Sequence, residues 1–186
     1  MLRLRRPSPE VVRSFLASQQ TLALSYDGEG GTNRGETPRG YAVDHNRQRL
    51  GSGAEAFERA KMAIRQWRTF PAPWTVIEPV TTPIEVGQVL AVHVRIFGIW
   101  WLNATRIVYV IDEPRRFGFA YGTLPGHAER GEERFTVEWL DDDTVWYDVL
   151  AFSRPRHPLA RLGYPLARMF QRRFGRASKA SMAAAV

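Results

Sequence analysis

The sequence contains no cysteine, which excludes disulfides, thiol nucleophiles and cysteine-ligated zinc or iron–sulfur centres. It also contains no apolar run near the roughly 20 residues that a membrane-spanning helix needs. The basic first ten residues are not followed by the apolar segment of a signal peptide. These absences predict a cytoplasmic protein with no transmembrane segment, no metal site and no cofactor.

Acidic residues are missing from the last segment, because no Asp or Glu follows Asp148. Removing its eight basic residues from the 26 Lys and Arg leaves 18, against 19 Asp and Glu. The net charge of +7 therefore resides in this segment, which predicts weak binding to an anionic surface, either lipid or RNA. No sequence-reading motif accompanies it, so we expect no specific DNA recognition. The eight are Arg154, Arg156, Arg161, Arg168, Arg172, Arg173, Arg176 and Lys179, and the expected anion-binding residues are Arg168, Arg172, Arg173 and Arg176.

The middle of the chain has the composition of a β-sheet. Its segments are rich in β-branched and aromatic residues and are separated by short turns, so they predict an antiparallel meander, since parallel neighbours would need crossover helices. A polar strand is expected just before them. The predicted strands are residues 41–50, 88–97, 100–111, 117–124, 134–140 and 144–153.

Three segments have helical spacing. Residues 8–20 begin with Ser8 as N-cap, and residues 54–70 carry an apolar stripe that Pro71 ends. After Pro155 a long basic helix is expected, bent at Pro165. Its apolar face comprises Leu159, Leu162, Leu166, Met169, Phe170 and Phe174.

Together these segments predict one α+β domain, a curved antiparallel meander packed on a long C-terminal helix. Residues 1–40 form an N-terminal extension with a helix and a glycine-rich, mobile loop over residues 27–40. Residues 41–180 form the body, and residues 181–186 a frayed tail. Residues 51–56 match the GxGxxA dinucleotide pattern, but the strand before them is polar and no βαβ unit follows, so a turn at a helix N-terminus is expected.

The densest polar group lies in residues 121–134. Tyr121 and Thr123 share one strand face with an aromatic row that runs toward a bend carrying His127. An imidazole, a phenol and Glu133 near one another would suit acid/base catalysis, with His127, Tyr121 and Glu133 as the candidates. The alternative is that His127 caps a turn and the glutamates face water. Metal binding by His127 with Glu129, Glu132 or Glu133 matches no standard ligand spacing.

Two charged residues fall on apolar strand faces. Arg106 alternates with Leu102 and Ala104, and Asp148 alternates with Trp146. Burying either alone costs several kcal/mol, so each should pair with the other or with another polar group, as a structural ion pair or as a ligand anchor in a cavity wall. His93 is expected to be a satisfied surface or interface histidine.

Five short motifs follow one another along the chain: residues 50–60, Trp67, and residues 121–127, 131–135 and 151–155. In this order and spacing they resemble a family of bacterial and plant proteins known as a conserved domain of unknown function. The resemblance begins at Tyr41 and covers nearly all the chain from there. The family is grouped with the helix-grip superfamily of START lipid-transfer domains, pollen-allergen-like proteins and aromatic polyketide cyclases. This implies a cavity between a curved sheet and the C-terminal helix, and it carries over no catalytic residue.

The first expected function is binding of a small, mostly apolar or amphipathic molecule in that cavity. Its polar anchors would be Arg106, Tyr121, Thr123, His127 and Asp148. The second is an acid/base enzyme of cyclase, hydratase or hydrolase type that uses the same cavity. The third is an interaction protein that binds anionic lipid or RNA through its basic helix.

Overall fold

The computed structural model describes residues 1–70 and 74–186, and in that part of the chain all side chains except those of residues 160 and 161. Pro71, the expected end of a helix, and the Arg161 side chain of the basic segment lie outside the described residues.

One antiparallel sheet dominates the described chain, with the strand order β2-β8-β7-β6-β5-β4-β3 and with β1 paired to β5. The six predicted strands are confirmed in type and order, and the meander runs from β3 to β8. The strands β1 and β3 were not predicted, because two and four residues are too short for a periodic pattern. The strands of the described residues are β1 (Leu2–Arg3), β2 (Ala42–Ser52), β3 (Thr75–Glu78), β4 (Val89–Ile96), β5 (Ile99–Glu113), β6 (Arg116–Thr123), β7 (Glu129–Trp139) and β8 (Thr144–Pro155).

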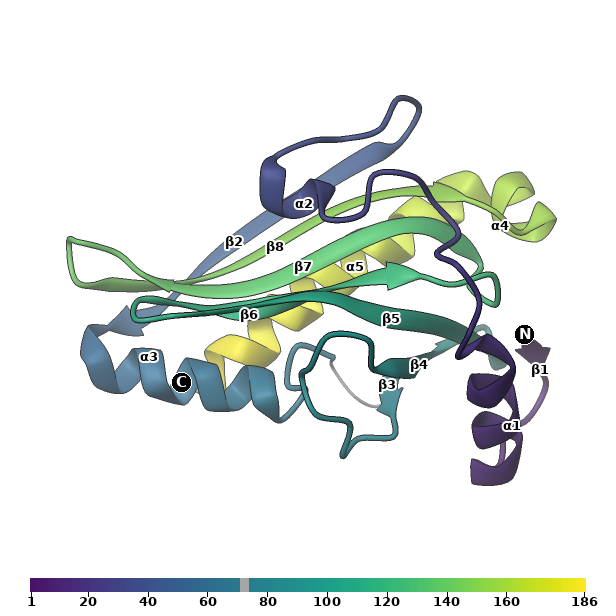
Figure 1. Ribbon diagram of the computed structural model, residues 1–186, viewed down its shortest axis with the longest axis horizontal. Helices are drawn as coiled ribbons and strands as arrows, with labels where there is room; N and C mark the ends of the chain where they lie inside the picture. The colour runs from purple at the N-terminus through teal and green to yellow at the C-terminus, as the bar shows by residue number, and fades with distance from the viewer. Residues whose placement is uncertain (71–73) are drawn as a thin grey trace.

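Helices lie against both faces of the curved sheet (Figure 1). The long helix α5 crosses one face, and α3 packs at the end of the same face. On the other face α1 buries Val12 and Leu16 against Leu102 and Ala104 of β5. None of the described helices combines the length and the apolar character needed to cross a membrane. The helices described are α1 (Pro9–Gln19), α2 (Gly31–Arg34), α3 (Gly53–Arg65), α4 (Pro158–Leu162) and α5 (Tyr164–Ala183).

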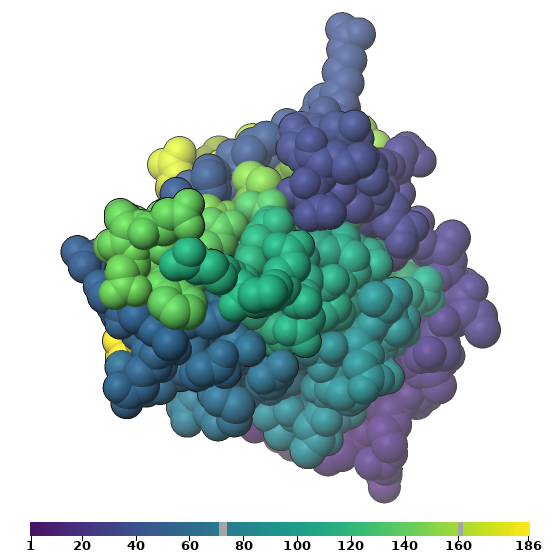
Figure 2. Space-filling model, turned by 60° about the vertical axis from the view of Figure 1, so that its left-hand side comes forward, coloured from purple at the N-terminus to yellow at the C-terminus, as the bar shows by residue number. Residues whose placement is uncertain are grey.

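The main core fills the interior at the α3 end of the molecule. Phe57 and Ile64 of α3 are buried among Phe119, Phe135 and Tyr147 of the sheet. In the space-filling view from this end, the atoms of α3 lie directly against the turns that join β5 to β6 and β7 to β8 (Figure 2). Side chains therefore fill this half of the space under the sheet, and any cavity must lie toward the other half.

Two helix predictions need correction. The helix α3 ends at Arg65, not at residue 70, because Trp67 takes a left-handed conformation with φ of 58° and turns its side chain into the core. The C-terminal helix is divided at Gly163, so Pro165 lies in the first turn of α5, where no helical hydrogen bond is lost, and does not bend it. Leu162 remains 83% exposed, so the predicted apolar face is only partly buried.

The predicted frayed tail and mobile loop are both anchored. The helix α5 continues to Ala183 and Met182 is fully buried, while the Val186 carbonyl oxygen accepts a 2.8 Å hydrogen bond from Arg59 Nε. In the loop, α2 forms a short helix whose start is held by the Glu132 carboxylate. The sequence gives no local signal for either contact, because both partners are more than 90 residues away.

Candidate functional site

A cavity of about 270 Å³ lies between the sheet and the first half of α5. This is near the lower end of the range for small-molecule sites, about 300–1,000 Å³. The wall is formed by α5 over residues 166–175, by Leu159 of α4 and by the strands β2–β8, so the cavity occupies the half of the interior that the core leaves free. Its apolar wall includes Trp74, Val92, Val94, Ile96, Trp101, Val149, Leu166, Phe170 and Phe174.

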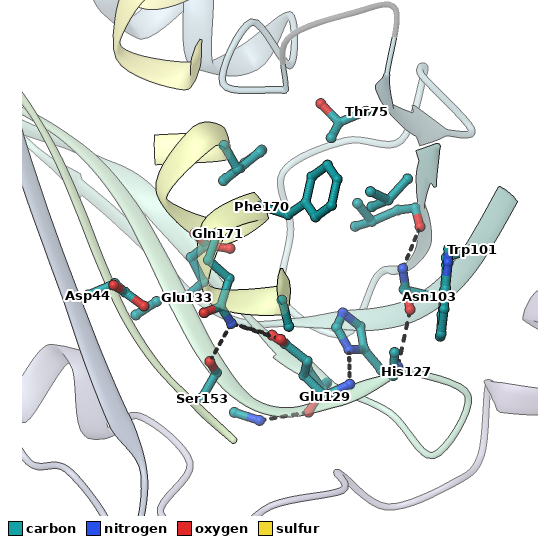
Figure 3. Close-up of a pocket in the computed structure, with 18 of the residues that line it drawn as sticks. Asp44, Thr75, Trp101, Asn103, His127, Glu129, Glu133, Ser153, Phe170 and Gln171 are labelled. Carbon is teal, nitrogen blue, oxygen red and sulfur yellow. Dashed lines mark hydrogen bonds between the residues drawn. The ribbon is translucent and has the colours of Figure 1, made fainter. Parts of the chain in front are cut away.

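Polar side chains gather at the end of the cavity where β7 begins. Glu129 and Glu133 lie four residues apart on one strand and both border the cavity. The Gln171 side chain of α5 donates hydrogen bonds of 2.8 and 2.9 Å to the two oxygens of Glu129 and contacts Ser153 Oγ at 3.0 Å (Figure 3). Burial raises the pKa of Glu129, because desolvation penalises its charged form more than these hydrogen bonds favour it.

Glu133 is paired with a phenol. The Tyr121 hydroxyl donates a 2.5 Å hydrogen bond to Glu133 Oε2. Burial raises the pKa of Glu133 to about 7, with the negative charges of Glu129 and Asp44 adding to the effect and the Tyr121 bond opposing it. Burial also raises the pKa of Tyr121 well above its usual value, so its phenol stays protonated. Glu133 therefore titrates near neutral pH while its partner remains a hydrogen-bond donor.

His127 borders the same polar end and is neutral at physiological pH. Its Nδ1 accepts a 2.9 Å hydrogen bond from the Glu129 backbone amide, so the neutral ring carries its hydrogen on Nε2. Burial lowers the pKa of His127 to about 3. The bend itself is fixed by Asn103, whose side-chain oxygen accepts the Ala128 amide at 3.1 Å. His127 thus caps a turn, as one reading of the sequence expected, and also faces a cavity.

An ion pair closes the polar end toward β2. Arg168 of α5 contacts both carboxylate oxygens of Asp44, with Nη2 and Oδ1 2.7 Å apart. Arg168 also donates to Gln171 Oε1 at 2.7 Å, so the Gln171 amide is oriented with its nitrogen toward Glu129. The charge of Asp44 is balanced by Arg168, whereas Glu129 and Glu133 have no such partner among the described residues.

The cavity lining has an unusual charge pattern for a protein of net charge +7. Among the described residues that line it there is no Lys or Arg, but there are four carboxylates. Asp44 is paired, and Glu132 binds Tyr26 Oη at 2.6 Å and the α2 backbone on the far side of the sheet. Glu129 and Glu133 therefore set the charge of the cavity. No group of three His, Asp or Glu side chains in the described chain is arranged to hold a metal ion.

Four of the predicted site residues meet in the cavity: Tyr121, Thr123, His127 and Glu133. The Thr123 hydroxyl is already used, because it contacts Ser25 Oγ at 2.7 Å and accepts the Gly131 amide at 2.9 Å. The alternative that the glutamates of this segment face water is wrong for Glu132, which is 2% exposed.

Arg106 and Asp148 lie outside the cavity lining, so their predicted role as cavity anchors is corrected. Arg106 donates to the Gln20 carbonyl at 2.7 Å at the end of α1. Asp148 accepts hydrogen bonds from Arg134 at 2.9 Å and His45 at 2.6 Å. Each charge is paired as expected, but not with the other. Alternation shows which residues share a face, but here both faces of the sheet carry apolar residues, so it could not identify the cavity face.

His93 and Arg168 also differ from their predictions. His93 is fully buried, not a surface residue, and its Nε2 lies 3.2 Å from Glu78 Oε2; burial lowers the pKa of His93 to about 4. Arg168 is committed to Asp44, so it is not a free anion-binding residue. The Arg173 guanidinium lies 4.9 Å from the Trp74 ring centre, and Arg172 and Arg176 are exposed.

Sequence reasoning missed Asp44, Asn103 and Gln171. Gln171 carried a signal, since it lies between Phe170 and Phe174 on a helix whose other polar residues are mostly basic. Asp44 lies in a strand of alternating polar residues, where nothing marked the side that faces the cavity. Asn103 lies beside Leu102 and Ala104 in β5, but its side chain points to the opposite face.

Comparison with known proteins gives the family. Residues 25–181 match the model of a domain of unknown function, DUF1990. The chain belongs to this family. A UPF0548 protein of Deinococcus radiodurans is 40% identical over 188 residues, covering 95% of this chain and 94% of that protein. A UPF0548 protein of Dictyostelium discoideum is 34% identical over 191 residues, covering 91% and 88%.

One solved structure shows the same fold at low sequence identity. The hypothetical protein jhp0584 from Helicobacter pylori superposes with a TM-score of 0.55 at 14% identity, covering 87% of this chain and 95% of that chain. A START superfamily protein from Mycobacterium smegmatis gives a TM-score of 0.46 at 15% identity, covering 77% and 97%. The curved antiparallel sheet around a C-terminal helix is the helix-grip fold that the family resemblance implied.

Proposed function

We propose that this DUF1990 protein binds a small, mostly apolar molecule in the cavity under α5, with a basic or hydrogen-donating group of the ligand at Glu133 and Glu129. The observation that carries the proposal is the lining itself, in which apolar and aromatic side chains form the wall and two unpaired carboxyl groups mark one end. The apolar wall provides the affinity by removing ligand surface from water. The carboxyl groups provide orientation and selectivity.

The charge of the polar end determines which ligands fit. A ligand carboxylate or phosphate placed beside Glu129 and Glu133 would meet like charge without a Lys or Arg in the described lining to offset it. An ammonium group would supply the counter-charge that both carboxyl groups lack, and a hydroxyl or amide would donate a hydrogen bond to them. We therefore propose an amphipathic amine, or a neutral molecule with a donor group, as the ligand class.

Isothermal titration calorimetry with octylamine, octanol and octanoate tests this proposal. An alkylamine keeps its proton below about pH 10, as a lysine side chain does, whereas Glu133 must ionise to pair with it. Affinity for octylamine should therefore fall as pH drops below about 7, by up to about tenfold per pH unit. Octanol carries no charge, so its affinity should change with pH much less than that of octylamine.

Glu133→Gln is the matched variant, since the amide keeps the acceptor for Tyr121 but removes the charge. It should weaken octylamine binding at pH 8 and remove the loss of affinity that Glu133 protonation causes near pH 7, with octanol binding retained. Glu85→Gln, at an exposed site outside the cavity, is the control. Tightest binding by octanoate would contradict the ligand class, and the absence of saturable binding by all three would contradict the cavity function.

A second candidate is acid/base catalysis in the same cavity. The observation that favours it is the Tyr121–Glu133 pair, in which a carboxyl group with a pKa near 7 adjoins a phenol that stays protonated. Glu133 would accept a proton from the substrate, and Tyr121 or Nε2 of His127 would donate to a developing oxyanion. A molecule that co-purifies with the Glu133→Gln variant, identified by native mass spectrometry, is the substrate to test. Its conversion by wild type and not by the variant would establish an enzyme, whereas unchanged recovery from both would exclude one.

A further inference from the structure

Large apolar side chains are exposed around the mouth of the cavity. Phe97, in the turn between β4 and β5, is 77% exposed, and its ring packs against Phe170 of α5 with centroids 5.9 Å apart. This contact joins the turn to the helical side of the mouth, where Leu159 and Leu166 both line the cavity. Leu162 of α4 and Met169 of α5 are exposed on the same two helices and do not line the cavity. We call the exposed set the apolar rim: Phe97, Leu159, Leu162, Leu166 and Met169.

A band of positive charge adjoins the apolar rim. Arg172 and Arg176 share a surface groove with Met169 and Pro165, and both are exposed. Neither forms an ion pair with any described residue, and no acidic residue follows Asp148 in the sequence. We call Arg172, Arg173 and Arg176 the basic band.

The spacing of the two features fits a lipid interface. Along α5 the rim residues Leu166 and Met169 precede the basic band residues by three to ten positions, which is about 5–15 Å along the helix axis. Interfacial segments bury apolar side chains about 5–10 Å into the boundary between headgroups and acyl chains, with basic residues at the headgroups. We propose that this end of the molecule docks on an anionic lipid bilayer, with the apolar rim inserted and the basic band at the lipid phosphates.

The apolar rim argues for lipid and against RNA as the occupant. RNA is bound through basic side chains and through aromatic or guanidinium surfaces that stack on bases, and exposed leucines contribute to neither. Four of the five rim residues are aliphatic or thioether side chains. Docking goes beyond the proposed ligand binding and does not depend on it, although it would place the cavity mouth at the bilayer surface.

Vesicle flotation tests the proposal with the intact, ligand-free protein. Vesicles of phosphatidylcholine with phosphatidylserine should bind the wild type, and vesicles of phosphatidylcholine alone should bind it at least about tenfold more weakly. The double variants Leu162→Ser/Met169→Ser and Arg172→Glu/Arg176→Glu should each lose about tenfold in binding or more. All four side chains are exposed, so these variants should fold normally.

Matched controls carry the same changes elsewhere on the surface. Val80→Ser/Val86→Ser alters two valines that are 65% exposed, and Arg13→Glu/Arg39→Glu reverses two exposed charges; neither should change vesicle binding. Glu133→Gln should not change it either, so docking and ligand binding can fail separately. No binding to the anionic vesicles, or undiminished binding by Leu162→Ser/Met169→Ser, would overturn the proposal. Binding of polyuridylic acid without vesicle binding would assign the basic band to RNA and overturn it equally.

Discussion

Tyr121 Oη and Glu133 Oε2 lie 2.5 Å apart inside the cavity, so a carboxyl group removed from bulk water has a neutral donor beside it and no cationic partner among the described residues. The charges near this pair are those of Glu129 on the same strand and of Asp44, which Arg168 balances, while His127 is neutral. Ionising Glu133 in the folded protein therefore costs free energy, so the stability of the protein should depend on pH.

Stability should fall with rising pH because of Glu133. Burial raises the pKa of Glu133 in the folded protein to about 7, above its ordinary value of 4.5, so between these values the folded state binds more protons than the unfolded state. The stability that protonated Glu133 contributes is fully present below about pH 4.5 and is lost as the pH rises through 7. Glu133→Gln should raise the free energy of unfolding at pH 8 by on the order of 1–3 kcal/mol and change it little at pH 4.5. Urea denaturation at both values measures this, and an equal effect at both would contradict it.

Asp44 and Arg168 should show strong energetic coupling. Their side chains are about one quarter and one fifth exposed and meet through two contacts, so removing either partner leaves a poorly solvated charge. A double-mutant cycle of Asp44→Asn and Arg168→Met should give a coupling free energy of about 1–2 kcal/mol by chemical denaturation. Arg172→Met, on an exposed neighbour, should change stability by less than about 0.5 kcal/mol. If the effects of the two single substitutions on the free energy of unfolding add up to that of the double variant, the ion pair does not stabilise the protein.

Met182 should be a stability determinant although it lies only four residues before Val186. It is fully buried in the main core, so Met182→Ala should lower the free energy of unfolding by about 2–5 kcal/mol. Met169→Ala is the control, since Met169 is about half exposed and should cost under about 1 kcal/mol. Thermal denaturation of the two variants compares them, and similar melting temperatures would mean that the tail is frayed after all.

Glu132 should hold the N-terminal extension in place. Its carboxylate accepts hydrogen bonds from Tyr26 Oη and from the backbone amides of Gly30 and Thr32, all at 2.6–2.9 Å. Glu132→Ala would leave these buried donors unpaired, at about 1–3 kcal/mol each. Limited trypsin digestion should then cut at Arg34 well before the rest of the protein unfolds. Unchanged protection of that bond would contradict the anchoring role.

The order of β4 to β8 and the type of the longer elements could be predicted because they depend on local signals, whereas the pairing of β2 with β8 was not predicted. The strands β4 to β8 have short turns between β-branched and aromatic runs, and Ser8 with Pro9 marks the start of α1. Nothing local determined that Trp67 would adopt a left-handed conformation and end α3 early, since the reason is its fit into the core. The contacts of Met182 and Glu132 are likewise tertiary.

The site was predicted in part for the same reason. Tyr121 lies at the end of a strand and His127 in the bend that follows it, so their closeness in space could be predicted from their closeness in sequence. Arg106 was assigned to the wrong face, because α1 covers an apolar patch of β5 opposite the cavity and makes both faces of that strand apolar. Asp148 alternates with Phe152 in β8, whose ring packs against Tyr26 and Tyr41 of the N-terminal segment. Asp44 and Gln171 reach the polar end from β2 and α5, which only the folded chain places beside Glu129.

A titration of the ¹⁵N-labelled protein with octylamine at pH 8, followed by amide chemical shifts, tests the central claim most directly. If the cavity is the binding site, the saturable shifts will concentrate at residues that line it on several strands and on α5, among them Asn103, Thr123, Glu133 and Gln171. The amides of α1 and α3 would stay nearly unchanged. Shifts scattered over the surface, or no saturable shifts at the cavity residues, would contradict the account.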